Sequence, residues 1–310
     1  MKLKLPHKII IGIGSFLLIY GATFAGLKML DKQKAAEVNI DASAGEVSVH
    51  NAYMENADGF YVGEIIGNTF EGKGQYNFLS GEIYAGDWLD SKMDGEGRMV
   101  FEGVGIYDGE YTDSLRGGYG VFTWNNGDVY KGVWQEDKMN GKGEYTFADG
   151  AVLSGTFADN RFDSGEFTVT TKKYTLKRTV VDGKFKDDVS IDLSSGESFY
   201  GTVSDGKFSG TGTVQYSNGD KYTGSFSANK RNGEGTYTWK EDGARYTGSW
   251  SNDKMDGNGT YYYSDEEYPR LEGGFSDGAP EGTCTYYETA NVKYRTTWSD
   301  GECEKVEEQK

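Results

Sequence analysis

Few side chains in this sequence belong to the types that catalyse reactions. The only histidines are His7 and His50, so the chain beyond them has no imidazole for a catalytic triad or a histidine zinc site. Carboxylates are plentiful, and a glycosidase needs just a pair of them. Many, such as Asp94, Asp149 and Asp256, stand at positions typical of turns, which aspartate itself favours. The sequence therefore predicts no enzyme, no cofactor and no metal site.

The cysteines are a second candidate for chemistry. In the strand register that the repeats predict, Cys284 and Cys303 lie near the ends of adjacent strands, close together but not opposite each other. Outside the cytoplasm such a pair could form a disulfide. The other interpretation is two unpaired small residues, since neither has the Cys or His neighbours of a metal site.

A third candidate is the only dense basic cluster in an otherwise acidic region, formed by Lys172, Lys173, Lys177 and Arg178. One interpretation is a degenerate repeat whose charges lie in a solvated hairpin. The other is a contact site for an acidic partner or for lipid phosphate.

Aromatic residues are the fourth candidate, because they recur at a fixed position of a repeated pattern. They could form the core of a sheet, or line a groove that holds an extended peptide, an amphipathic helix or a glycan. The candidate binding residues of this kind are Trp88, Tyr111, Trp134, Phe157, Phe226, Trp250 and Trp298.

A pattern of about 23 residues positions all of these side chains. Glycine usually follows the opening residue by two positions and recurs at eleven and thirteen. A ring or branched residue stands at four, a lysine or arginine often at eight, and large apolar residues at fifteen and seventeen. The copies begin at Tyr61, Tyr84, Tyr107, Tyr130, Leu153, Leu176, Phe199, Tyr222, Tyr246, Leu271 and, incompletely, at Tyr294.

The sequence of each copy predicts a β-hairpin. In the copy that opens at Tyr107, rings or glycines alternate with polar residues in both halves, which indicates two strands with one face of rings. Ser114–Gly118 and Asn125–Asp128 carry the glycine and asparagine that tight turns require. The glycines fall on the ring face, where a ring can lie flat across bare backbone, and rings of successive copies would stack along the sheet.

The copies resemble the MORN (membrane occupation and recognition nexus) repeat, and the resemblance covers residues 61 to about 300. It implies an elongated antiparallel single sheet with an aromatic-lined face. Proteins with these repeats have been linked to membrane tethering, protein assembly and phosphoinositide lipids, and the kinase or methyltransferase domain that some carry is missing here. The motif is present as Tyr84, Gly86, Trp88, Lys92, Gly95 and Gly97, and again as Tyr130, Gly132, Trp134, Lys138, Gly141 and Gly143.

The predicted fold is therefore all-β, an elongated single-layer antiparallel sheet of about ten stacked 23-residue hairpins at 61–300. The array is degenerate at 153–198, and an acidic tail at 301–310 lacks the second half of its hairpin. In the degenerate part Ser164, Glu166, Asp187 and Val189 stand at the later glycine positions, and Arg178 stands at the early one.

The N-terminal part predicts a membrane anchor. Residues 9–27 are apolar and long enough to cross a bilayer core of roughly 30 Å as one transmembrane helix. Lysines precede them, so residues 1–8 would be cytoplasmic and the array extracytoplasmic. The alternative is a secreted protein after signal cleavage near Thr23–Ala25. Residues 28–60 are small and polar and predict a stalk of weak order.

The net charge of −17 opposes binding to nucleic acid. The sequence thus predicts a non-catalytic, single-pass scaffold at a bacterial cell surface. It would bind an unidentified protein partner or a second copy of itself as a homodimer. The alternative is an envelope module that binds glycan or lipid through exposed rings or the Lys172–Arg178 patch.

Overall fold

The computed structural model describes residues 37–40 and 47–309. All of its regular elements are β-strands, which confirms the predicted all-β class. Strands β2 to β24 form one open antiparallel sheet, and β1 adds to it beside β2. Among the described residues no helix is long and apolar enough to cross a bilayer. The predicted anchor at 9–27 lies outside those residues.

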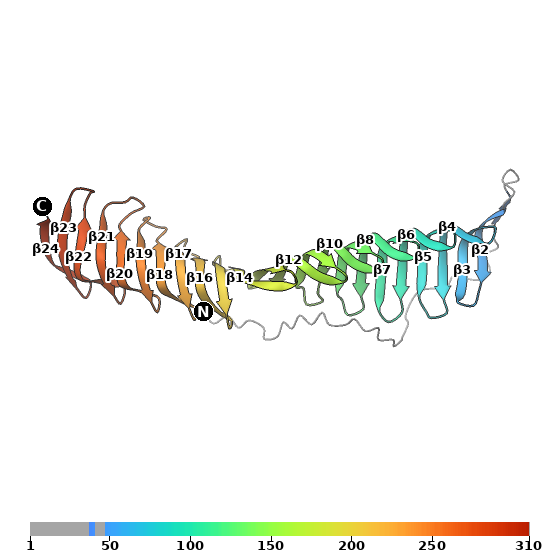
Figure 1. Ribbon diagram of the computed structural model, residues 1–310, viewed down its shortest axis with the longest axis horizontal. Helices are drawn as coiled ribbons and strands as arrows, with labels where there is room; N and C mark the ends of the chain where they lie inside the picture. The colour runs from blue at the N-terminus through green and yellow to red at the C-terminus, as the bar shows by residue number, and fades with distance from the viewer. Residues whose placement is uncertain (1–36, 41–46, 310) are drawn as a thin grey trace. The chain divides into compact units, whose positions relative to one another are not determined.

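The chain divides into two compact units (Figure 1). The N-terminal unit runs to Phe167 and includes Val180–Lys184, while the C-terminal unit comprises Thr168–Thr179 and the chain from Phe185 onward. The first strands are β1 (Glu37–Ile40), β2 (Val47–Glu55), β3 (Gly59–Ile66), β4 (Thr69–Phe78), β5 (Ile83–Leu89), β6 (Lys92–Phe101), β7 (Gly105–Thr112), β8 (Leu115–Trp124), β9 (Val129–Gln135), β10 (Lys138–Thr146), β11 (Val152–Ala158) and β12 (Arg161–Thr170). They are followed by β13 (Tyr174–Val181), β14 (Lys184–Leu193), β15 (Ser198–Ser204), β16 (Lys207–Gln215), β17 (Lys221–Ser227), β18 (Lys230–Thr238), β19 (Arg245–Ser251), β20 (Lys254–Tyr262), β21 (Arg270–Ser276), β22 (Ala279–Tyr287), β23 (Lys293–Ser299) and β24 (Glu302–Gln309).

The array starts earlier and ends later than the sequence predicts. Residues 47–55, expected in a weakly ordered stalk, form β2 and pair with β3. The tail expected to lack a second strand forms β24, which pairs with β23. The polar side chains of both segments concealed their strand character, because in a single-layer sheet an end strand needs little apolar surface.

The tight turn of each hairpin lies earlier than predicted. In the copy at Tyr107 the turn is Asp113–Ser114, both with positive φ of 49° and 68°, and Leu115 already begins β8. Positive φ at both central residues defines the type I′ turn, whose twist matches that of paired strands. The expected turn glycines instead belong to the strand, where Gly118 has φ of +54° at a break in the β7–β8 register.

On the ring face, the opening tyrosine of a repeat lies across that repeat's own glycine pair. Gly86 and Gly97 face each other on β5 and β6, and a methyl group at Gly97 would come within 2.5 Å of the Tyr84 ring. The Tyr84 hydroxyl donates to the Asp87 carbonyl oxygen (2.9 Å). The same arrangement recurs at Tyr61, Tyr107, Tyr130, Tyr222 and Tyr246, all fully buried.

The opening tyrosine of one repeat and the ring at position four of the next meet edge to face, not in the predicted stack, although Phe101 and Phe122 of successive repeats are stacked with ring centroids 5.6 Å apart. Trp134 packs at 85° against Tyr107 of the preceding repeat and Tyr130 of its own, with ring centroids 5.3 Å apart in both pairs. Its indole Nε1 donates to the Gly120 carbonyl oxygen (3.3 Å), which the missing side chain exposes. Such pairs add about 0.5–1.5 kcal/mol beyond area burial, because the positive ring edge faces the negative ring face.

Hydrogen bonds between neighbouring turns join the repeats along the sheet edge. The Ser114 hydroxyl accepts from the Met93 amide (3.2 Å), and the Ser114 amide donates to the Met93 carbonyl oxygen (2.9 Å). We call this reciprocal pair the turn clasp. It recurs from Ser91 to Phe70, Asp137 to Arg116, Asn160 to Met139, Asn229 to Phe208 and Asp253 to Arg231.

The lysine at position eight also acts between repeats. Lys138 Nζ lies 2.9 Å from Asp159 Oδ1, the first turn residue of the next repeat. Both side chains are largely exposed, so water screens their attraction and the pair adds little to stability. The ion pair instead helps to set the register between repeats, because it aligns consecutive turns.

The opposite ends of the hairpins are held by a carboxylate. Asp220 is buried, and its carboxylate accepts from the Tyr237 hydroxyl (2.7 Å) and the Lys240 amide (2.9 Å) of the next repeat. Burial opposes ionisation, but these hydrogen bonds and one from Asn218 outweigh it, so the pKa of Asp220 lies below its usual range. Asp128 binds Tyr145 and Ala148 in the same way, at the predicted turn Asn125–Asp128.

The predicted break at 153–198 is a real change in packing. At its start Gly165, not Glu166, lies against Gly155, so the facing glycine comes one residue earlier than the pattern places it. In the next repeat Leu176, Val189 and Ile191 form a small aliphatic cluster where other repeats have a tyrosine over glycines. In the turn Asp182–Gly183 the second residue is glycine, so the side-chain half of the clasp is missing, while the Gly183 amide still donates to the Asp163 carbonyl oxygen (2.7 Å).

Replacing one glycine of a pair tests the packing directly. Gly97→Ala should destabilise the fold by about 1–3 kcal/mol or more, because its methyl group overlaps the Tyr84 ring. Gly117→Ala is the matched control, since its methyl group would meet its nearest neighbour at 3.5 Å. Urea unfolding followed by tryptophan fluorescence measures both, and equal losses would contradict the account.

The buried tyrosines predict a loss of stability in alkali. Burial raises the pKa of Tyr130, Tyr222 and Tyr246 to about 12, above an unfolded value of about 10. Their contribution is full below pH 10 and is lost as pH rises through 12, because the unfolded chain releases these protons first. Urea midpoints between pH 8 and 12 should fall less steeply for Tyr222→Phe, which resembles the natural Phe199. An unchanged pH profile would show that Tyr222 does not contribute.

Candidate functional site

The aromatic residues predicted as candidate binding residues form the core. Trp88, Tyr111, Trp134, Phe157, Phe226 and Trp250 are each at most 7% exposed, and Trp298 is partly exposed. In Trp134 even the ring face is covered, since the Arg116 guanidinium lies 4.5 Å from its centroid and pairs with Asp137. Apart from Phe226, which lines the cavity described below, and the partly exposed Trp298, these rings cannot stack on a ligand while the repeats are folded.

The basic cluster does not come together as one patch. Lys172 and Lys173 are exposed at the tip between β12 and β13. Arg178 points to the ring face, where its guanidinium lies over the Phe185 ring at 4.4 Å and donates to the Lys186 carbonyl oxygen (2.8 Å). Burial lowers the pKa of Arg178. The hairpin tip therefore offers two lysines to a partner, while Arg178 takes part in packing.

The predicted disulfide is not formed, and the strand order explains why. Cys284 lies on β22 and Cys303 on β24, so β23 separates them, whereas the sequence predicts adjacent strands. Two strand spacings of about 4.8 Å exceed the Cα separation of about 4.4–6.8 Å that a disulfide spans. Cys284 instead takes the place of a ring-face glycine, and burial raises the pKa of its thiol.

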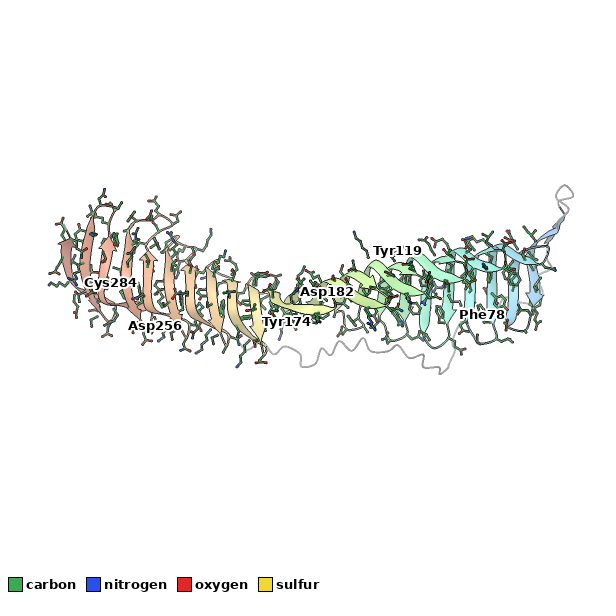
Figure 2. The ribbon with its side chains drawn as sticks, in the orientation of Figure 1. Phe78, Tyr119, Tyr174, Asp182, Asp256 and Cys284 are labelled. Carbon is green, nitrogen blue, oxygen red and sulfur yellow. The ribbon has the colours of Figure 1, made fainter. Side chains whose placement is uncertain are left out.

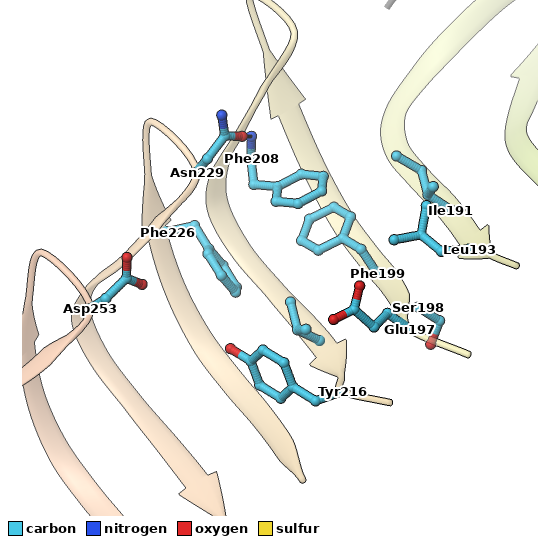
Figure 3. A pocket seen from close by; sticks show the side chains of 11 residues that line it. Ile191, Leu193, Glu197, Ser198, Phe199, Phe208, Tyr216, Phe226, Asn229 and Asp253 are labelled. Carbon is cyan, nitrogen blue, oxygen red and sulfur yellow. Dashed lines mark hydrogen bonds between the residues drawn. The ribbon is translucent and has the colours of Figure 1, made fainter. Parts of the chain in front are cut away.

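An apolar cavity opens on the ring face of the C-terminal unit. Its volume is about 170 Å³, and it lies between strands β14 and β17. Figure 3 shows Phe199 and Phe208 with Ile191 and Leu193 to one side and Phe226 and Tyr216 to the other. The full lining is Ile191, Leu193, Glu197, Ser198, Phe199, Phe208, Val214, Tyr216, Phe226, Asn229 and Asp253.

The cavity exists because the sequence departs from the repeat rule at these strands. Positions fifteen and seventeen carry rings in the ordinary repeats, for example Phe122 with Trp124 and Tyr237 with Trp239. The copies at Leu176 and Phe199 carry Ile191 with Leu193, and Val214 with Tyr216, at those positions. Smaller side chains on adjacent strands leave empty volume that the rigid sheet does not close.

The walls of the cavity are well ordered by their own contacts. Phe199 and Phe208 are stacked with centroids 3.6 Å apart, and Phe226 meets Phe199 at 85°. Asn229 Oδ1 accepts from the Phe208 amide (2.7 Å) as part of the turn clasp. Burial raises the pKa of the Tyr216 hydroxyl. The cavity is thus a preformed apolar site, smaller than the pockets of roughly 300–1,000 Å³ that hold small molecules in most proteins.

A second hollow lies on the outer face of the N-terminal unit, opposite the rings. It is an open groove of about 490 Å³ across β4 to β8, beside the Tyr119 ring, which is 57% exposed. Tyr119 is labelled in Figure 2. The charged side chains that line the groove are partly paired, as in the ion pair of Arg98 with Asp108 (3.0 Å).

Sequence reasoning missed both hollows. The lost glycines indicate the break at 153–198, but the cavity overlaps only the end of that break, at Ile191–Ser198, and extends into the ordinary repeats beyond it. Aliphatic residues at positions fifteen and seventeen, Ile191, Leu193 and Val214, were the available signal. In the part of the chain that the structure describes, no group of three or more His, Cys, Asp or Glu side chains could hold a metal ion.

Comparison with known families finds MORN repeats in seven places in the chain. No curated protein matches the chain. Repeats of this kind generally suggest a protein involved in binding or interaction. The matched residues are 84–103, 107–129, 130–152, 199–221, 222–243, 246–267 and 272–288, which leaves 153–198 unmatched.

The burial of the rings predicts different roles for Trp134 and Tyr119. Trp134→Ala should destabilise the chain by about 3–5 kcal/mol, since it removes a buried ring and two edge contacts. Tyr119→Ala should change the free energy of unfolding by only about 0.5 kcal/mol, because most of that ring is already in water. Urea denaturation measures both, and a small effect of Trp134→Ala would contradict the assignment of this ring to the core.

Proposed function

We propose that this chain, which carries MORN repeats in seven places, is a non-catalytic scaffold that binds other proteins. Residues 9–27 anchor it in a bacterial cell membrane by a single span, with the array on the outer side. The lysines that precede this apolar run support that orientation.

The apolar cavity of the C-terminal unit carries the proposal. Ordinary repeats fill their ring face with their own side chains, as the burial of Tyr222, Tyr246 and Trp250 illustrates. Between β14 and β17 that filling stops and a preformed apolar site opens. An empty cavity does not stabilise a sheet whose strands are already paired and packed. This favours the interpretation that the cavity binds a partner.

The alternative, an envelope module that binds glycan, rests on the outer groove of the N-terminal unit. Sugar rings pack on exposed aromatic faces and take hydrogen bonds from charged side chains. Tyr119 offers such a face, with Lys73, Asp108 and Glu110 along the groove. Lipid binding has a weaker basis, since of the predicted basic patch only Lys172 and Lys173 stand exposed at the hairpin tip and Arg178 packs on Phe185.

Crosslinking of the full chain in intact cells, followed by mass spectrometry, tests the proposal. The scaffold predicts one or more proteins that recur among the captured species and that are kept by the Tyr119→Ala variant. Capture of envelope polysaccharide instead, competed by free sugar and lost with Tyr119→Ala, would contradict the scaffold and support the glycan module.

A further inference from the structure

The cavity between β14 and β17 also defines what kind of partner fits. We infer that it receives one leucine- or phenylalanine-sized side chain from a basic segment of the partner protein. This inference rests on the proposed scaffold function and names the chemistry of the segment that the scaffold binds.

The size of the cavity limits its occupant to a single side chain. At about 170 Å³ it is close to the engineered cavity of about 150 Å³ that holds one benzene molecule. A fatty acyl chain needs a much longer channel, and a sugar would leave its hydroxyl groups unpaired against Ile191, Leu193 and Val214. An aliphatic or aromatic side chain satisfies both the volume and the lining.

The rim of the cavity favours positive charge beside that side chain. None of the eleven described residues that line it is basic, and Glu197 and Asp253 are acidic. Asp253 forms an ion pair with Arg231 (3.3 Å), which partly neutralises its charge. Glu197 instead accepts a hydrogen bond from the Ser195 hydroxyl (3.4 Å), which leaves its negative charge in place. The chain as a whole carries −17, so a basic segment is attracted from a distance as well as at the rim.

The rest of the array shows how the cavity can be closed without disturbing the fold. Position fifteen, which is Val214 here, is a tyrosine in the copies that open at Tyr130, Tyr222 and Tyr246. Val214→Tyr therefore restores the ordinary residue and fills the site from its own wall. Thr213→Tyr is the matched control, since it adds the same ring one residue earlier, on the outer face of β16.

The test uses a labelled five-residue peptide with leucine at its centre and two lysines on each side. Fluorescence polarisation measures its binding to the full chain in phosphatidylcholine nanodiscs, with empty nanodiscs as the blank. Replacing the peptide leucine by alanine should weaken binding about tenfold or more, which corresponds to burial of one such side chain. Val214→Tyr should weaken it as much, and Thr213→Tyr should leave it unchanged.

Several results would overturn the inference. Equal binding of the leucine and alanine peptides would show attraction by charge alone, and unimpaired binding by Val214→Tyr would place the site elsewhere. No binding of either peptide, or preferential binding of lauric acid, would also reject it. If Val214→Tyr fails to fold, Ile191→Phe fills the cavity from the opposite wall. Crosslinked protein partners that persist with Val214→Tyr would sustain the scaffold while rejecting this site.

Discussion

One contact governs this structure, the tyrosine ring that lies across two facing glycines. A single-layer sheet has no second layer to cover its apolar face, so its core must form within the layer. Bare backbone at Gly86 and Gly97 lets the Tyr84 ring approach closely enough to be fully buried and to donate its hydroxyl to a carbonyl oxygen. Edge-to-face contacts then pass from each tyrosine to the ring of the next repeat, so burial in one repeat depends on its neighbour.

The turn clasp follows the same logic at the hairpin ends. Positive φ is unfavourable for turn residues such as Ser114 and Ala228, which lack the tolerance of glycine, asparagine and aspartate for this conformation. A reciprocal pair of hydrogen bonds to the preceding repeat compensates for that cost. Where Gly183 occupies the turn, the backbone adopts a similar φ without a side chain, and only the backbone half of the clasp remains, from the Gly183 amide to the Asp163 carbonyl oxygen (2.7 Å). Departures from the repeat pattern in that part of the array therefore change the contacts between repeats but leave the backbone of each hairpin intact.

Much of the fold is readable from the sequence, because the period, the alternation and the ring–glycine complementarity are all local. The sequence misplaces the hairpin turn because the clasp that holds Asp113–Ser114 comes from a strand about twenty residues away. It misjudges Cys284 and Cys303 because one intervening strand decides their separation. The cavity is harder still to predict from the sequence. Val214 and Leu193 are ordinary apolar residues, and only comparison with the rings at the same positions of other repeats shows that they leave empty volume.

Amide hydrogen exchange along the full chain, read by mass spectrometry, tests the central claim most directly. If rings over glycines and clasps between turns stabilise the sheet, exchange should be slowest in β5–β10 and β17–β20, which have both, and clearly faster in β13 and β14. Equal protection of β13 and β14, or rapid exchange at the glycine positions of β6 and β10, would show that the sheet is held together by something else.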